Sequence, residues 1–300
     1  MSGAPQPLRI TNQMILSRSL ESIGRGLEDI ARLERQISSG QRWSTLSEAP
    51  VDGRSVLAID ADLRAADQYA RNIEAAKTRV ATSDTTLQGV TDALARAREL
   101  AIQQGGSTAT AASRAAAQKE LAQLQNAVIQ LANRRLNGAF LFGGVYADRP
   151  PLDAQGALDP LFPGRGAPLA EIAPGVLAPA AHDAGEMFID TDVIGSMDAL
   201  DAALAANDPT AIQSASDRLR DAIANVQEVV TDVGARQVRL DMAQESHAIV
   251  SDGLRARRSI LADTPMEEAV TRLVARHSAY QASLLATGRT LETSLVNYLR

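Results

Sequence analysis

The 300-residue sequence contains no cysteine, which excludes disulfide bridges, thiolate metal sites and cysteine nucleophiles together. Aromatic residues make up only 3% of the chain, a low share for a compact enzyme, whose pockets are usually lined by aromatic side chains. Long helices that pack along a narrow seam of Ala and Leu need less aromatic volume. The composition therefore favours an elongated helical protein.

The sequence also lacks the features that membranes and nucleic acids require of a partner. No stretch approaches the roughly 20 apolar residues that span a bilayer. The formal net charge of −6 disfavours binding to phosphate backbones and to anionic lipid surfaces. Met1–Pro7 have neither a cationic start nor an apolar run, so we predict no cleaved secretory signal peptide. We expect no nucleic acid and no membrane among the partners.

Residue patterns typical of catalysis and of metal binding are missing as well. His182, His247 and His277 lie far apart, and none has the spacing of a metal-binding helix motif. The chain has only two lysines, Lys77 and Lys119, and no phosphate-binding loop. We therefore predict no catalytic residue, no cofactor and no metal site, and expect His247 and His277 to be packing residues in helical seams.

What the sequence does contain is a long helical periodicity. Apolar residues separated by steps of four and three begin at Leu16 and predict a first amphipathic helix. After an irregular stretch that ends at Pro50, a second helix of about 50 residues is predicted, ending at Gly105 and Gly106. Its seam repeats every seventh residue, at Ile59, Ala66, Ile73, Val80, Leu87, Leu94 and Ala101. A third helix is expected to return antiparallel to it after a short loop.

The helical pattern is interrupted between Phe140 and Gly195. Seven of the twelve prolines and five of the nine aromatic residues lie in this stretch, and proline is excluded from helix interiors and central strands. We predict a loop-rich or small β insertion with a modest aromatic core.

Helical periodicity resumes after Asp208 and Pro209, which predict a capped helix start. Its heptad column comprises Leu219, Val226, Val233, Leu240, Leu254 and Leu261, with His247 in the same register. The segment from Thr264 to Glu267 predicts a capping box and the start of a last helix. One apolar column of that helix comprises Val270, His277, Leu284, Leu291 and Tyr298, and Val274 begins a second.

These patterns predict a mainly α fold, in which the N- and C-terminal regions form an elongated antiparallel helical bundle or coiled coil with the insertion in the middle. Both chain ends are expected at one end of this rod. The predicted domains are a terminal coiled-coil assembly domain (1–50 and 262–300), a helical rod domain (51–139 and 196–261) and the inserted module (140–195).

Apolar stripes at both ends of the chain predict an assembly interface. Chain ends usually fray unless they are tied down, so two apolar ends point to pairing with each other and with neighbouring subunits. The predicted interface residues are Leu16, Leu20, Ile23, Leu27, Ile30, Ile37, Leu284, Leu291, Leu295, Tyr298 and Leu299.

Four segments, in order and at the predicted breaks, resemble the bacterial flagellin superfamily. They are LRITNQM at 8–14, QISSGQR at 36–42 followed by SEAPV at 47–51, NGAFLFGG at 137–144, and LETSLVNYLR at 291–300. The last of them resembles the ending of the hook-associated members of that superfamily. The resemblance covers both terminal thirds of the chain and leaves the insertion uncovered.

This resemblance implies a structural protein of the extracellular flagellum, exported through the flagellar type III apparatus. The hook-associated members imply a junction between hook and filament, with copies of itself, the first hook-associated protein, flagellin and a flagellar export chaperone as partners. The alternative is flagellin itself, the filament subunit. A cytoplasmic coiled-coil signalling module is a more distant alternative, because such hairpins lack a proline-rich insertion at their tip.

Overall fold

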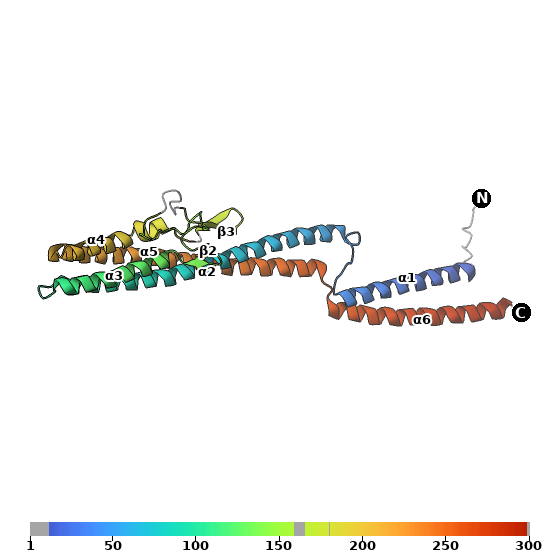
Figure 1. Ribbon diagram of the computed structural model, residues 1–300. Coiled ribbons are helices and arrows are strands. Elements are labelled where there is room, and N and C mark those ends of the chain that lie inside the picture. Colours follow the sequence, from blue (N-terminus) through green and yellow to red (C-terminus); the bar gives the residue numbers. More distant parts are fainter. Residues whose placement is uncertain (1–11, 159–165, 180, 299–300) are drawn as a thin grey trace, which may run out of the picture. The chain divides into compact units, whose positions relative to one another are not determined.

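The computed structural model describes residues 12–158, 166–179 and 181–298 (Figure 1). Six α-helices, two small antiparallel sheets and one π-helical turn make up its regular structure. In chain order these are α1 (Asn12–Ser39), α2 (Pro50–Gln104), α3 (Ala111–Ala132), β1 (Arg135–Leu136), β2 (Ala139–Phe140), β3 (Leu169–Ala173), β4 (Val176–Pro179), η1 (Gly185–Ile189), α4 (Val193–Ala205), α5 (Pro209–Ala262) and α6 (Met266–Tyr298). The predicted mainly α fold with a small β insertion is confirmed.

The chain divides into two compact units. The terminal unit comprises the residues up to Leu63 and those from Asp252, and the central unit comprises Arg64–Ser251. The long helices α2 and α5 contribute to both units.

In the central unit, α2 and α5 run antiparallel, and Lys77 Nζ of α2 lies 2.6 Å from Asp241 Oδ1 of α5. Helix α3 returns along α2, where Arg96 Nε lies 2.7 Å from Glu120 Oε1. Helix α4 packs on α3. The predicted return of the third helix is therefore present.

The heptad columns of α2 and α5 form the seam between the long helices. Every residue of the α2 column from Ile59 to Ala101 is buried, as are the α5 residues from Leu219 to Leu240 in the same register. A seven-residue repeat keeps one stripe of each helix facing its neighbour over many turns. The predicted seam is confirmed for these segments.

Two short hairpins interrupt the helices: β1–β2 lies just before the insertion, and β3–β4 lies within it. Asn137 and Gly138, with φ of 52° and 85°, turn the chain between β1 and β2, as a two-residue hairpin loop requires. Phe142 and Phe188 are fully buried and meet edge to face, with ring centroids 5.4 Å apart. Both rings belong to the same hydrophobic core as the seam residues of α2 and α5. Phe142 and Phe188 therefore form part of the core of the central unit, whereas Tyr146 is exposed.

The hairpin of β3 and β4 is held on the long helices by hydrogen bonds to its backbone. Asn72 Nδ2 of α2 donates to the carbonyl oxygen of Glu171 at 2.9 Å. From α5, the His247 ring hydrogen-bonds the Ile172 carbonyl and also packs against Tyr69. His247 is thus a packing residue that fixes the hairpin on α5.

In the terminal unit, α1 and α6 lie side by side and antiparallel (Figure 1). Asp29 of α1 lies 3.5 Å from Arg276 of α6, and Glu34 lies 3.7 Å from His277. The predicted pairing of the two terminal regions is confirmed. The predicted capping box of α6 is wrong, because the Thr264 hydroxyl is buried without a hydrogen-bond partner in the described part of the chain.

Candidate assembly interface

The inner face of the helix pair in the terminal unit combines a few large residues with small ones. Ile30 and Leu33 of α1 and Ala269 of α6 are buried between the helices. Further along, Tyr280 lies over Gly26, where an added Cβ atom would come within 3.7 Å of the tyrosine ring. Gly26 and Ala269 are small and allow the backbones of α1 and α6 to approach closely. The larger aliphatic residues of α6 therefore lie on its other faces.

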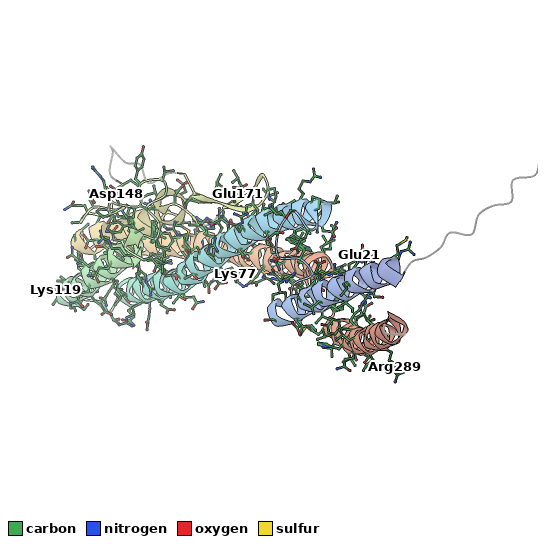
Figure 2. All side chains as sticks on the ribbon, turned by 90° about the vertical axis from the view of Figure 1, so that its right-hand side faces the viewer. Glu21, Lys77, Lys119, Asp148, Glu171 and Arg289 are labelled. Carbon is green, nitrogen blue, oxygen red and sulfur yellow. The ribbon has the colours of Figure 1, made fainter. Side chains whose placement is uncertain are left out.

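The outer faces of the same two helices expose large aliphatic side chains. On α1, Leu20 and Leu27 are one heptad apart and 57% and 52% exposed. On α6, Val270, Val274 and Leu284 are exposed. Water-exposed aliphatic residues in a repeating stripe mark a surface that binds another protein. Glu21 on α1 and Arg289 on α6 mark the two helices in Figure 2.

The sequence-predicted interface residues fall into three groups. Leu20, Leu27 and Leu284 are exposed; Ile23, Ile30 and Ile37 are half-buried or buried against α6. The side chains of Leu16, Leu291, Leu295 and Tyr298, and Leu299 entirely, lie outside the described residues. Val270 and Leu284 of the α6 column are exposed, whereas His277 of the same column lies 3.7 Å from Glu34 of α1.

The loop between α1 and α2 is clamped to the link between α5 and α6. Arg42 Nη1 donates to the Ile260 carbonyl at 3.0 Å, and the Trp43 indole N–H donates to the Leu261 carbonyl at 3.2 Å. Gly40, at φ 70°, accepts from the Thr264 amide at 2.8 Å through its carbonyl oxygen. These bonds join two segments that are more than 200 residues apart in the sequence.

Glu48 closes the same loop from within. Its carboxylate accepts hydrogen bonds from the Ser44 amide at 2.9 Å and the Ser44 hydroxyl at 3.1 Å. The backbone hydrogen bond from Ser44 is the largest cause that lowers the pKa of this carboxylate. Next to the loop, Trp43, Leu46, Val56 and Leu57 line a mostly apolar hollow of about 230 Å³. Sequence reasoning identified the turn but missed this hollow and the tryptophan clamp.

The central unit also has an exposed apolar surface, which sequence reasoning missed. Val238, Met242 and Ile249 of α5 are 59%, 66% and 69% exposed. They follow one another at helical spacing, but the buried heptad column at Val233 and Leu240 gives a stronger periodic signal in the same segment. Val238, Met242 and Ile249 are separated by four and seven residues, and this helical spacing is the sequence pattern that could have predicted the exposed surface.

Several charged groups of the central unit lie next to groups of opposite charge or form ion pairs. His182 is buried, with its ring nitrogens 3.0 Å from Glu186 and 3.1 Å from Asp232. Asp192 binds Arg218 through both carboxylate oxygens. No group of three His, Asp or Glu side chains in residues 12–158, 166–179 and 181–298 is arranged to hold a metal ion. None of the helices within those ranges is long and apolar enough to cross a membrane.

The comparison with known families agrees with this architecture. Residues 10–147 match the bacterial flagellin N-terminal helical region, and residues 217–299 match the bacterial flagellin C-terminal helical region. The two matches lie on either side of the β3–β4 hairpin and α4, and together they cover α1, α2, α6 and most of α5. The chain belongs to the bacterial flagellin family, whose members are structural proteins of the flagellum.

The individual relatives include a hook-associated protein and a filament protein. Flagellar hook-associated protein 3 of Salmonella typhimurium is 25% identical over 147 residues, which are 49% of this chain and 46% of that protein. The chain therefore matches about half the length of this relative. A flagellar filament 30.7 kDa core protein of Treponema maltophilum is 27% identical over 237 residues, 77% of this chain and 78% of that protein.

A solved structure shows the same fold. A putative flagellar hook-associated protein from Vibrio parahaemolyticus superposes with a TM-score of 0.64 at 23% identity, covering 72% of this chain and 99% of that one.

Proposed function

We propose that this chain is a structural subunit of the hook–filament junction of the bacterial flagellum, of the hook-associated protein 3 type. The observation that carries the proposal is the outer face of the α1–α6 pair, where Leu20, Leu27 and Leu284 are exposed although they continue helical apolar stripes. Burial of one such side chain contributes about 1.5–3 kcal/mol, so a few of them on each helix can hold a neighbouring subunit.

The proposed partners are copies of the chain itself, the first hook-associated protein on the hook side and flagellin on the filament side. Export through the flagellar type III apparatus, with the help of a flagellar chaperone, belongs to the same proposal. The similarity to Salmonella hook-associated protein 3 and to the Vibrio structure supports a junction role.

Gene deletion tests this function directly. Cells without a junction protein should assemble hooks but release flagellin into the medium, and a plasmid copy of the gene should restore filaments. Cells of the deletion strain that still carry normal filaments would contradict the proposal.

Filament formation by flagellin is the second candidate function. It is favoured by the similarity to the Treponema filament core protein, which covers more of this chain than the Salmonella match does. The deletion strain separates the two functions, because loss of the filament subunit leaves hooks with no flagellin to release.

The outer face can be tested in the same strain with two charge substitutions. Leu27→Asp and Leu284→Asp each place a carboxylate on the proposed contact without entering the α1–α6 seam, so the monomer should fold and be secreted but fail to be incorporated. Ser22→Asp, an exposed polar position on α1, is the matched control and should be incorporated normally. Normal incorporation of both leucine variants would remove the outer face from the interface.

A further inference from the structure

Arg79 of α2 is a half-buried cation without a partner. Its guanidinium makes no hydrogen bond and no ion pair with any described residue, whereas Lys77, two residues earlier, is paired with Asp241 at 2.6 Å. Burial lowers the pKa of the Arg79 guanidinium, since desolvation disfavours its charged form. An unpaired charge that has lost part of its hydration is costly, and an anion that docks beside it recovers that cost.

Arg79 lines a groove between α2 and the insertion, which we call the hairpin groove. It has a volume of about 390 Å³ and is bordered by Asn72, Ala75 and Arg79 of α2, Asn137 of the β1–β2 turn, and Leu169 and Ala170 of β3. The one carboxylate at its rim, that of Glu171, accepts a hydrogen bond from the Gly175 amide at 3.2 Å within the hairpin turn. Glu171 and Lys77 are labelled in Figure 2. The groove therefore offers walls of mixed character, with two asparagines beside small and aliphatic residues, around a single available cation.

The outer surface of α5 has the complementary chemistry. Val238, Met242, Glu245 and Ile249 follow one another at steps of four, three and four residues, which puts them on one face of the helix; we call them the α5 outer stripe. Glu245 is exposed, and no cation pairs with it in the part of the chain that the structure describes. Its neighbours one turn away are Asp241, Met242, Ala248 and Ile249, none of them basic. The stripe is therefore an apolar surface with one free carboxylate at its centre.

The stripe and the groove of one molecule cannot meet each other. The α5 face that contacts α2 carries buried Leu240 and the Asp241 that binds Lys77, and the stripe lies on the opposite side of the helix. Lys77 also binds Gln244, so these two residues lie at the same level along the helix pair. Arg79 is two residues from Lys77, and Glu245 is one residue from Gln244. At 1.5 Å per residue, Arg79 and Glu245 are therefore separated by less than about 10 Å along the helix axis. A neighbouring copy beside the first, at nearly the same height, can therefore bring its stripe to the groove.

We propose that the α5 outer stripe of one copy docks in the hairpin groove of the next, with Glu245 paired to Arg79. This inference rests on the proposed function, in which copies of the chain assemble. The contact joins two different surfaces, so each copy keeps one groove and one stripe for further neighbours, and the contact propagates around a ring or along a helix. The apolar residues of the stripe bury against Leu169 and the alanine walls, and the ion pair fixes the register.

Charge reversal tests the pairing on the full chain. Arg79→Glu and Glu245→Arg should each weaken self-association at least about tenfold, measured by sedimentation velocity over a concentration series. The double variant should recover the wild-type association constant to within about threefold, because the reversed pair is again complementary. Lys119→Glu and Glu228→Arg, exposed charges on α3 and on α5 outside the stripe, are the matched controls and should leave association unchanged.

Cross-linking gives a second measurement that does not depend on the strength of the ion pair. The chain has no cysteine, so Arg79→Cys combined with Glu245→Cys introduces the only two thiols. Mild oxidation of the assembled protein should give a ladder of disulfide-linked dimers, trimers and larger species, and the Lys119→Cys with Glu228→Cys pair should not.

The proposal is overturned if the single reversals associate like the wild type, or if the double variant is no better than the singles while circular dichroism shows both folded. It is also overturned by the absence of a ladder from the 79/245 pair. These results leave the junction role untouched, since that role stands or falls on the deletion phenotype.

Discussion

Glu48 shows how one exposed side chain can order a loop. Its carboxylate binds the amide and hydroxyl of Ser44, and the pKa of Glu48 is lowered chiefly because the charged form accepts the backbone hydrogen bond. A carboxyl whose pKa is lower in the folded state stabilises that state above its unfolded pKa, and this contribution is lost as the pH falls through the folded value.

We therefore expect the Ser44 amide to be protected from hydrogen exchange at neutral pH and to lose protection on acidification. Glu48→Gln keeps the side-chain shape but removes the charge, so its protection factor should be lower at neutral pH and nearly constant through the acid range. NMR-detected exchange measures both. Equal protection in the two proteins at pH 7 would show that the loop is ordered without this carboxylate.

Asp198 on α4 has the opposite electrostatic situation. Burial raises the pKa of this carboxyl, and the neighbouring Asp201 adds to the effect. The charged form is therefore disfavoured in the folded state at neutral pH, although Gln125 donates a hydrogen bond to it at 3.0 Å.

Asp198→Asn should raise the melting temperature at pH 7, because the amide oxygen still accepts from Gln125 and the charge is gone. The side chain is largely exposed, so a gain of about 1–3 °C is expected. The difference from the wild type should disappear as the pH falls below the ordinary aspartate pKa, where both proteins carry an uncharged group. Calorimetry at two pH values checks this, and a lower melting temperature at pH 7 would contradict it.

At the scale of the helix, the sequence predicted which stripes are apolar more reliably than it predicted what covers them. The column from Ile59 to Ala101 is buried because α5 supplies a matching heptad column in the same chain. Val270 and Leu284 belong to an equally periodic column of α6, yet both are exposed. Periodicity shows that a stripe needs a partner, but the partner can be another molecule.

The parts that the sequence did not predict depend on contacts between distant segments. The inner face of α6 relies on Ala269 and Tyr280, which carry little periodic signal. The Trp43 clamp and the hairpin groove form only when residues far apart in the sequence meet. The wrong capping box at Thr264 has the same origin, since that residue bonds through its backbone to Gly40.

Truncation of a buried side chain and truncation of an exposed side chain on α2 should change the free energy of unfolding by different amounts. Leu94→Ala removes a fully buried side chain of the α2 seam and should lower the free energy of unfolding by about 2–5 kcal/mol. Ile102→Ala, on an exposed face of the same helix, should change it by less than about 0.5 kcal/mol. Urea denaturation followed by circular dichroism measures both. Similar losses for the two variants would mean that burial does not set the energetics of α2.

At the scale of the whole molecule, the two units differ in how completely each covers its own apolar residues. The central unit buries its seams together with Phe142 and Phe188 in one hydrophobic core. The α1–α6 pair of the terminal unit buries few large residues, Ile30 and Leu33 among them, and exposes others such as Leu20, Leu27 and Leu284. Elements with few buried contacts open more readily than those in a core.

Hydrogen exchange of the purified monomer should therefore be much faster in α1 and α6 than in the α2 and α5 seam of the central unit, by about tenfold or more. On assembly, exchange around Leu27 and Leu284 should slow, while exchange around Leu87 and Val226 should stay the same. Mass spectrometry of peptic fragments resolves these segments. Terminal helices that are already as protected as the core in the monomer would contradict the proposed role of their outer faces.

The hydrogen bond from Trp43 to Leu261 has a practical consequence, since this chain has a single indole. Its ultraviolet emission therefore comes from one known place, where the loop between α1 and α2 is hydrogen-bonded to the end of α5. A red shift of the emission would report that this hydrogen bond has broken and that the indole is exposed to water. A blue shift on polymerisation would report that a neighbouring subunit fills the hollow beside Trp43. The protein thus has a built-in optical reporter that needs no dye and no substitution.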